Sequence, residues 1–391
     1  MTGPRSAGIR AFNAGGLAVR YEVLPWARSF AACLVVDCGS RDDPAGLSGT
    51  AHLAEHLHGL AAPAGPGAGI PLLAVTDVDR TCFEAAGDPV RVAPLLRRLL
   101  AIAAGRRPPA DRRVFEGERQ AVLLETRRMD HQPLLRLGPL LAAAAAAEPG
   151  LDAVGRTTTE SVRRITPADV DALAVTRYVP AAARLFLAGP PSPVPEVVAT
   201  LGTVAPLPAD PPTAGSRPAA GPPLSAVAGL DGILAVTLVR PRGVDSAVLD
   251  ALLADEGPIV DAAGEPRRRP GGRTTIAGRA QQVDVVCWAP GAATAGLGDR
   301  LAETATGDWQ ALAGDVARRD GRRRRNQHHL RHATPLRRVS EAARRAVLGP
   351  PDDTRELAWW RIADGVPVRL ARYPLGPHLA GGAGGQPAAD W

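Results

Sequence analysis

The 391-residue chain contains no lysine, so arginine supplies all 46 of its basic side chains. Aromatic residues make up only 4% of the sequence, whereas apolar residues make up 45%. Any core must therefore be built mainly from leucine, valine and alanine. The formal net charge is +6 and the sequence pI is about 9.8, a mildly basic balance that favours acidic peptide partners over nucleic acid.

Long apolar runs are also missing. No stretch of 18 apolar residues occurs, and residues 1–6 lack the apolar segment of a secretory signal. We therefore expect a cytoplasmic protein with no membrane span. The four cysteines, Cys33, Cys38, Cys82 and Cys287, form no C-x-x-C pair, which indicates buried free thiols.

Residues 49–57, GTAHLAEHL, contain the pattern H-x-x-E-H. Apolar side chains recur there at helical spacing, which predicts one amphipathic helix. His52 and His56 then lie one turn apart on the same face, close enough to share one tetrahedral metal ion. Glu55 lies beside them, where a carboxylate can take a proton from water at the metal. This is the inverted form of the H-E-x-x-H zinc signature. The periodic apolar residues are Leu53, Leu57 and Leu60.

A third metal ligand could come from a second predicted helix, residues 115–125, FEGERQAVLLE. Glu118 and Glu125 are seven residues apart, which is two turns, so they share a face. The alternative is that these acids form a solvated edge. That alternative fits Glu116 well, but it fits Glu125 less well because three apolar residues directly precede it.

These helices resemble those of the pitrilysin, insulinase and mitochondrial-processing-peptidase superfamily of zinc metallopeptidases, which are inverzincins. That family has H-x-x-E-H on one helix and a glutamate on a later helix, with a second glutamate seven residues before it. Other segments within residues 10–190 are similar to the family in the same order. They are VVDCGSRDD at residues 35–43, LSGTA at residues 47–51, AVTDVDRT at residues 74–81, YVP at residues 178–180 and RLFLAG at residues 184–189.

The resemblance implies a zinc-dependent endopeptidase subunit, similar to small bacterial processing peptidases. His52, His56 and Glu125 would hold Zn²⁺, with water in the fourth position. The catalytic residues would be Glu55, which activates that water, and Glu118, which orients a histidine or orders the site. The strand near residues 74–83 would accept the peptide substrate as an added β-strand. Removal of a leader from a precursor peptide is one role of small bacterial relatives.

The chain also departs from the family pattern. Leu73 stands where the family has an asparagine, so one polar contact near the substrate strand is missing. The spacing from His56 to Glu125 is a few residues shorter than usual. The second half has no zinc motif, and residues 264–278 lack the family's Arg and Tyr pair. We therefore expect a heterodimer with a homologous partner subunit that supplies the Arg and Tyr.

The expected fold class is α+β, with two related α/β-sandwich domains that form half of a clamshell chamber. Each domain would have an antiparallel-rich sheet covered by helices. The predicted bounds are residues 1–190 for the zinc-binding catalytic domain, 191–224 for a Pro/Gly-rich linker with a turn of helix at 194–201, 225–376 for a degenerate second domain and 377–391 for a disordered tail.

Local patterns predict the elements in more detail. Residues 17–24 and 29–36 are expected to be paired strands with Pro25 in the turn, and one strand is expected to run from Leu73 to Glu84. The other expected strands are residues 184–188, 232–239 and 282–288. The expected helices are residues 89–104, 108–128, 134–147, 167–175 with Thr166 as N-cap, 245–253, 292–313 and 336–348.

Two alternatives remain beside the enzyme hypothesis. The first is a non-catalytic binding or scaffold subunit of a peptidase complex, which would have no need for the intact Glu55. The second is a nucleic-acid binder that uses residues 318–332, RRDGRRRRNQHHLRH. No aromatic residue interleaves there to stack bases, and the arginines would repel a metal at His328 and His332. We therefore expect no nucleic-acid partner. His58 is expected to be an ordinary residue at the helix end.

Overall fold

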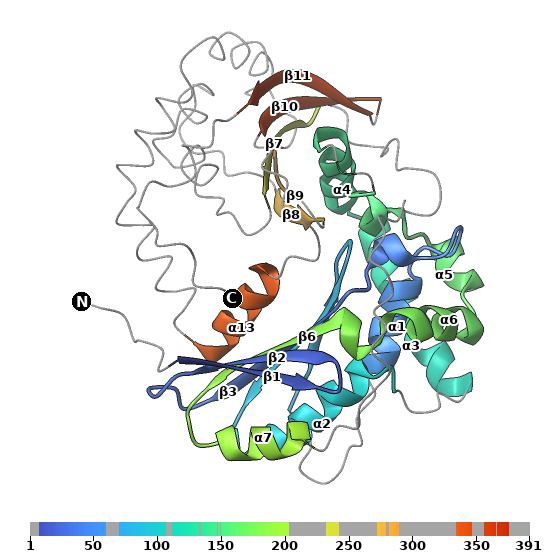
Figure 1. The fold of residues 1–391 in the computed structure, drawn as a ribbon. Helices are drawn as coiled ribbons and strands as arrows, with labels where there is room; N and C mark the ends of the chain where they lie inside the picture. Colours follow the sequence, from blue (N-terminus) through green and yellow to red (C-terminus); the bar gives the residue numbers. More distant parts are fainter. Residues whose placement is uncertain are drawn as a thin grey trace, which may run out of the picture. The chain divides into compact units, whose positions relative to one another are not determined.

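The computed structural model describes residues 8–59, 70–106, 112–132, 134–146, 148, 150–202, 232–241, 272–278, 281–288, 334–345, 356–364 and 366–374. Its helices and antiparallel-rich sheets form the predicted α+β fold (Figure 1). The chain divides into two compact units, and neither is continuous in sequence. Unit 1 comprises residues 1–127, 157–221 and 328–346, and unit 2 comprises residues 128–156, 222–327 and 347–391. The predicted domain bounds at residues 190 and 225 stay a prediction.

Unit 1 is built on a six-stranded sheet in which only β2 and β6 are parallel. The prediction that residues 17–24 and 29–36 pair directly was wrong, because β6 lies between β2 and β3. The amide of Leu24 donates to Gly189 O at the end of β6, so the connection passes over that strand. The strand order is β1 (Gly8–Ala14), β2 (Leu17–Val23), β6 (Ala183–Gly189), β3 (Phe30–Val36), β5 (Thr81–Gly87), β4 (Leu73–Thr76).

Residues 73–84 form a hairpin rather than the single strand that was predicted. Strands β4 and β5 are antiparallel, with Thr76 opposite Thr81. The amide of Asp77 donates to Arg80 O at 2.8 Å and closes the turn between them. Gly39 lies against this turn so closely that a Cβ atom there would come within 2.4 Å of Val78 O. The tight packing on the turn therefore requires a glycine at position 39.

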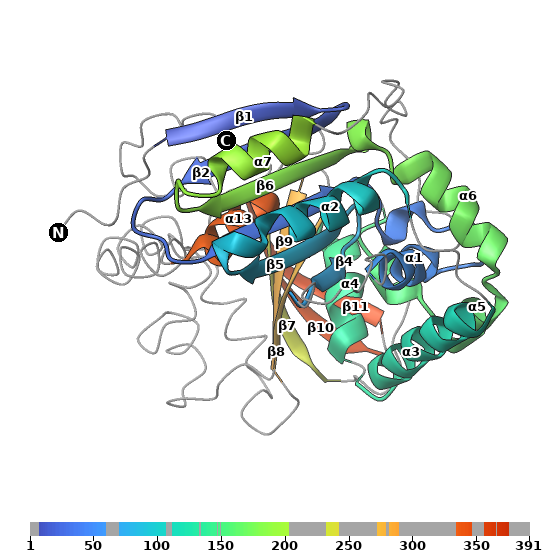
Figure 2. The ribbon, with the colours of Figure 1, turned by 90° about the horizontal axis from the view of Figure 1, so that it is seen from below.

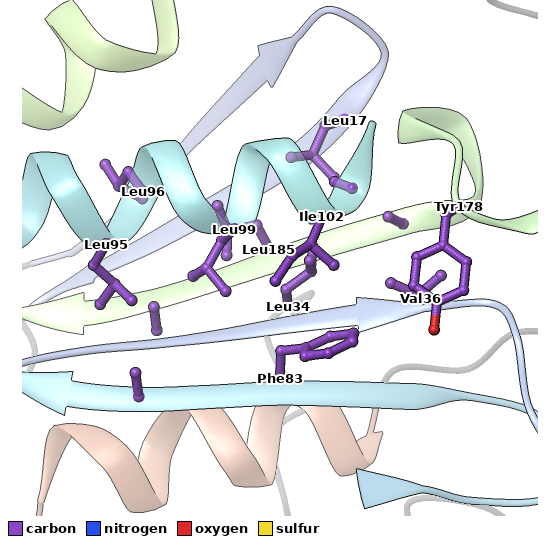
Figure 3. Close-up of a cluster of buried hydrophobic side chains, with 14 of the residues drawn as sticks. Leu17, Leu34, Val36, Phe83, Leu95, Leu96, Leu99, Ile102, Tyr178 and Leu185 are labelled. Atoms are coloured by element: carbon purple, nitrogen blue, oxygen red, sulfur yellow. The ribbon is translucent and has the colours of Figure 1, made fainter. Parts of the chain in front are cut away.

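Strand β3 is buried on both of its faces. Leu34 and Val36 point to one apolar cluster, whereas Cys33 and Val35 point to another, as expected for the two-residue period of a strand. Helix α2 (Val92–Ala103) covers the first face, and Figure 3 shows Leu95 and Leu99 directed at the sheet. Figure 2 shows α2 and α7 (Val194–Gly202) over this face. Helix α7 corresponds to the helical turn predicted inside the linker.

Helix α13 (Pro335–Arg345) covers the opposite face of the same sheet, although it comes from the C-terminal half of the chain. Val339, Ala342 and Ala343 pack on the cluster that contains Cys33 and Val35. Three polar contacts hold the helix to the strands. They are Arg338 to Glu22, Ser340 Oγ to Glu84 Oε2 at 2.9 Å, and Arg80 Nη1 to Ala343 O at 2.7 Å.

Four further helices complete unit 1 or connect it to unit 2. Thr166 caps α6 and exchanges hydrogen bonds with Asp169 in a capping box, which confirms the predicted N-cap. Helix α3 ends at Asp130, shortly before Pro133, because proline disfavours a helical conformation in the residue before it. The bounds are α1 (Thr50–Gly59), α3 (Arg112–Asp130), α5 (Thr159–Arg164) and α6 (Pro167–Arg177), with short 3₁₀ turns at Ser40–Asp42, Pro89–Arg91, Ala153–Arg156 and Pro180–Ala182.

Unit 2 contains a five-stranded antiparallel sheet against which α4 (Leu134–Ala145) packs. Gly138 of α4 approaches β8 so closely that a Cβ atom there would lie 2.4 Å from Thr274 Cγ2. A buried ion pair joins Arg240 to Asp284, with Nε and Oδ2 2.6 Å apart. The strand order is β11 (Val366–Pro374), β10 (Glu356–Ala363), β7 (Leu234–Pro241), β9 (Gln281–Trp288), β8 (Gly272–Ala277).

Several predictions fall outside the described residues. These are the helices at residues 245–253 and 292–313, the arginine-rich stretch at residues 318–332 and the tail from residue 377. Among the helices that the structure does describe, none has both the length and the apolar composition that crossing a bilayer requires.

Candidate metal centre

Helix α1 carries the H-x-x-E-H pattern, and its first turn is held by a carboxylate from outside the helix. Asp43 accepts hydrogen bonds from the amides of Gly49 and Ala51, each at 2.7 Å. Gly49 has φ +102°, and a Cβ atom there would lie 2.9 Å from Thr157 Cγ2, so a glycine is required. This cap fixes the backbone immediately before His52.

Helix α3 presents Glu118 and Glu125 to α1, as their seven-residue spacing predicts. His52 Nε2 lies 3.2 Å from Glu125 Oε2, and His56 Nε2 lies 3.8 Å from Glu125 Oε1. The side chain of Glu125 is 54% exposed, compared with 39% for Glu116. The prediction that Glu116 is the more solvated acid was therefore wrong. Glu116 is partly covered because it pairs with Arg119 at 2.5 Å.

His52, His56 and Glu125 fit one metal ion. One ligand atom from each lies within 4.8 Å of the other two. Bonds of about 2.0–2.2 Å at a tetrahedral angle separate two zinc ligands by roughly 3.4 Å, close to the two distances to Glu125. Two histidines and one glutamate are also a donor set typical of catalytic zinc. The three residues therefore have both the spacing and the chemistry of a zinc site.

Glu118 contacts the other ring nitrogen of His56. Its Oε2 atom lies 3.0 Å from His56 Nδ1. A proton on Nδ1 would be donated to this carboxylate, which leaves the lone pair of Nε2 directed toward Glu125. Carboxylates in this position orient metal-binding histidines and raise their basicity. Glu118 is therefore placed to act on a metal at this site through His56, and it is not one of the three convergent donors.

Glu55 lies between the two histidines in sequence. Its side chain is buried and is held by a residue of β4. Thr76 Oγ1 donates to Glu55 Oε2 at 2.5 Å and also lies 3.2 Å from Thr81 Oγ1. Only 6% of Glu55 is exposed. The hydroxyl of Thr76 therefore fixes one oxygen of the carboxylate.

Burial and neighbouring charged or polar groups shift the pKa values of Glu55 and His52. Burial raises the pKa of Glu55 above its ordinary value, against the lowering effects of His52, Thr76 and His56. Burial lowers the pKa of His52, but Glu125, Glu55 and Asp43 outweigh it, so the pKa of His52 lies above its usual value. A carboxylate with a raised pKa is a stronger base than an ordinary one, which suits proton transfer near neutral pH. A protonated His52 cannot bind a metal, so metal binding weakens as the pH falls.

His58 does not join the metal-binding group. It lies in the last turn of α1, as expected, and is fully buried. Its ring stacks on Tyr178 with centroids 4.0 Å apart, and Nδ1 bonds to Ala54 O at 2.8 Å. All four cysteines are free thiols, as predicted, and three are buried, whereas Cys82 is only half-buried.

Two residues of the site had no role in the sequence analysis. Asp43 lies seven residues before the start of α1, beyond the positions where capping residues are normally sought. Thr76 belongs to a segment that resembles the family, but nothing in the local pattern indicates that its hydroxyl meets Glu55. A polar side chain facing the helix side of a short strand was the only available signal.

Neither a protein-family model nor a curated protein sequence matches the chain. Solved structures do match it. A putative M16-like peptidase from Alicyclobacillus acidocaldarius is 16% identical with a TM-score of 0.61, over 87% of this chain and 89% of that one. A structure described as a peptidase M16 inactive domain, from Pseudomonas fluorescens, is 14% identical with a TM-score of 0.57, over 86% and 89%. Pitrilysin is 17% identical with a TM-score of 0.52, over 78% of this chain but only 38% of its own. The chain therefore has the fold of M16-type, pitrilysin-like peptidases, a group in which one of these structures is described as an inactive domain.

Proposed function

We propose that the chain is the zinc-binding subunit of a zinc-dependent endopeptidase. The observation that carries the proposal is the convergence of His52, His56 and Glu125 at distances suited to one tetrahedral ion. The fold of M16-type peptidases supports it. Precursor or leader-peptide processing is the role that we favour for such a subunit.

When bound at these three residues, zinc lowers the pKa of water and polarises a carbonyl group. Glu55 would take the proton from the attacking water and later deliver it to the leaving amine. Thr76 keeps Oε2 of Glu55 in place through its hydrogen bond. Glu118 would hold the tautomer of His56 through Nδ1. Glu55, Thr76 and Glu118 thus each have a separate task.

The substrate would lie along β4, one of the two edge strands of the unit 1 sheet. No strand of the described chain pairs with the outer edge of β4. An extended peptide could add there and form main-chain hydrogen bonds. Because Thr76 on this strand contacts Glu55, a peptide beside β4 would pass next to the proposed base.

We further propose that a homologous partner subunit completes the enzyme. The chain spans less than half of the pitrilysin chain that it matches, and it carries one zinc motif. The resemblance assigns an Arg and a Tyr opposite the metal to the other half of such enzymes, and residues 264–278 lack that pair. A single donor to the developing negative charge lowers the activation free energy by about 3 kcal/mol.

A non-catalytic binding subunit is the second candidate. The similar structure that is described as an inactive domain supports it, because the same fold then exists without activity. The two candidates differ in what they need from Glu55. A subunit that only binds peptide has no use for a base held by Thr76 beside two metal-binding histidines.

The deciding experiment measures zinc content and peptide cleavage for the chain and its Glu55→Gln variant, with and without the candidate partner. An enzyme subunit should carry about one zinc per chain. The variant should keep that zinc and its fold while losing cleavage, because Glu55 is assigned as base and not as ligand. Equal cleavage by the variant would exclude Glu55 as the base. Chelator-resistant cleavage would exclude the metal.

A further inference from the structure

The edge strand β4 presents two different faces. Ala74 and Thr76 face the helix side, where Ala74 packs on the main apolar cluster and Thr76 contacts Glu55. Leu73 and Val75 face the other way, and they are 62% and 52% exposed. Because side chains alternate along a strand, these two apolar side chains stand on one face of the strand that we assign to substrate.

Exposed apolar side chains are unusual on a sheet edge. Proteins commonly protect such edges with charged residues or proline, because apolar edges attract further strands. Strand β4 carries neither, since its four residues are LAVT. Leu73 also replaces the asparagine of the family that the sequence resembles. The strand is thus free of the features that would repel an apolar chain.

The neighbouring strand adds a charge to this face. Leu73 is paired with Glu84, and Val75 is paired with Cys82. Glu84 is fixed by Ser340 at 2.9 Å and by Cys33 Sγ at 3.6 Å. On this face, two aliphatic side chains therefore stand with one carboxylate beside Leu73. That negative charge disfavours acidic side chains on an incoming strand.

We propose that Leu73 and Val75 select substrates with aliphatic side chains at two alternate positions, i and i+2. The proposal rests on the proposed function, because it takes β4 as the strand that pairs with the substrate. In an added strand, the residues opposite Leu73 and Val75 project to the same face and are two apart. The residues between them project toward α1 and the metal-binding side chains. Selection and chemistry thus use opposite faces of one substrate strand.

Binding to a catalytically disabled chain tests the proposal separately from cleavage. Full-length Glu55→Gln protein, loaded with zinc, is titrated into fluorescent ten-residue peptides and followed by anisotropy. The peptides carry one Val-x-Val pair, moved stepwise along a polar background, and each has a matched Thr-x-Thr version. Valine and threonine have nearly the same shape and both favour strands, so the comparison isolates polarity.

We expect the best Val-x-Val peptide to bind about tenfold more tightly than its Thr-x-Thr match, which is about 1.4 kcal/mol and within the range of two cross-strand pairs. An additional Leu73→Asn, Val75→Thr double substitution should bring the two affinities within about twofold of each other. The matched control is Ile9→Asn, because Ile9 is 44% exposed on β1, the opposite edge strand of the same sheet. That variant should keep the tenfold preference.

Three results would overturn the inference. They are equal binding of the two peptide series, no binding of either, or a preference that survives the double substitution. Failure of the proposed function has a different signature. In that case the Val-x-Val preference persists. The parental chain, mixed with its candidate partner, then fails to cleave the preferred peptide or cleaves it without zinc.

Discussion

Replacement of Glu118 tests whether a carboxylate behind His56 sets the metal affinity of the site. Glu118 Oε2 lies 3.0 Å from His56 Nδ1, while His56 Nε2 faces Glu125 at 3.8 Å. The two ring nitrogens of His56 thus have different partners. If the assignment is right, Glu118 influences the metal only through the tautomer, orientation and basicity of this imidazole.

The magnitude follows from the hydrogen bond. Loss of such a partner typically lowers metal affinity about 10–100-fold. Glutamine keeps an oxygen that can accept from Nδ1, but a neutral acceptor gives about half the strength of a carboxylate. We therefore expect Glu118→Gln to weaken zinc binding about tenfold, or about 1.4 kcal/mol, and Glu118→Ala to weaken it about 100-fold. The side chain is 24% exposed, so salt should reduce the effect slightly.

The assay is competition for zinc against a chromophoric chelator at fixed pH and ionic strength, with circular dichroism to check the fold. Glu116→Gln is the matched control, because Glu116 lies on the same helix but pairs with Arg119. It should leave the zinc affinity unchanged. An affinity within twofold of the parent for both Glu118 variants would refute the assignment. A loss as large as that of Glu125→Gln would make Glu118 a ligand.

Three further predictions use the same protein. His52→Ala should nearly abolish zinc binding and Glu125→Gln should weaken it, as measured by metal content after dialysis; full occupancy in a His52→Ala, His56→Ala double variant would remove the metal assignment. Asp43→Ala should lower the free energy of unfolding by about 2–4 kcal/mol in urea titrations, because two buried amides lose their acceptor; the exposed cap variant Asp169→Ala should cost about 1 kcal/mol and leave zinc affinity unaltered. Cleavage by the chain alone should be weak and should rise on addition of a homologous partner that contains Arg and Tyr, so robust turnover that the partner does not change would contradict the heterodimer.

The sequence predicted the elements of the first half where periodicity is local. The helix of His52 and His56, the helix of Glu118 and Glu125, and strand β6 all occur near their expected bounds. The seven-residue spacing of the two glutamates correctly predicted a shared face, because two helical turns return a side chain to the same direction. The metal-binding group could therefore be proposed from spacing and resemblance together.

Features that depend on distant contacts were not predictable in this way. Strand β1 has mostly exposed side chains and therefore gives little apolar alternation. Strand β6 lies between β2 and β3, and the local sequence pattern of a strand does not predict which strand it pairs with. The role of Asp43 depends on how residues 43–49 fold back, and the role of Thr76 depends on how β4 packs on α1.

Helix α13 raises a question about the limits of the zinc-binding domain, which was expected to end near residue 190. The helix covers the face of the unit 1 sheet that contains Val35 and Phe186, two side chains that are 1% and 7% exposed. Exposing an apolar side chain of this size costs about 1.5–3 kcal/mol, and whole domains are stable by only about 5–15 kcal/mol. Removal of α13 would also leave Glu22, Glu84 and Arg80 without the partners that the helix provides.

A fragment of residues 1–224 should therefore fail to fold as a stable monomer, even though it contains every residue of the metal centre. Size-exclusion chromatography, thermal unfolding and zinc titration would show aggregation, no cooperative transition and weak metal binding. Residues 334–345 joined to the fragment through a Gly/Ser linker should restore all three properties, because the helix needs only to reach its own face of the sheet. If the bare fragment is monomeric, unfolds cooperatively and binds zinc like the full chain, then α13 is not part of the unit that supports the site.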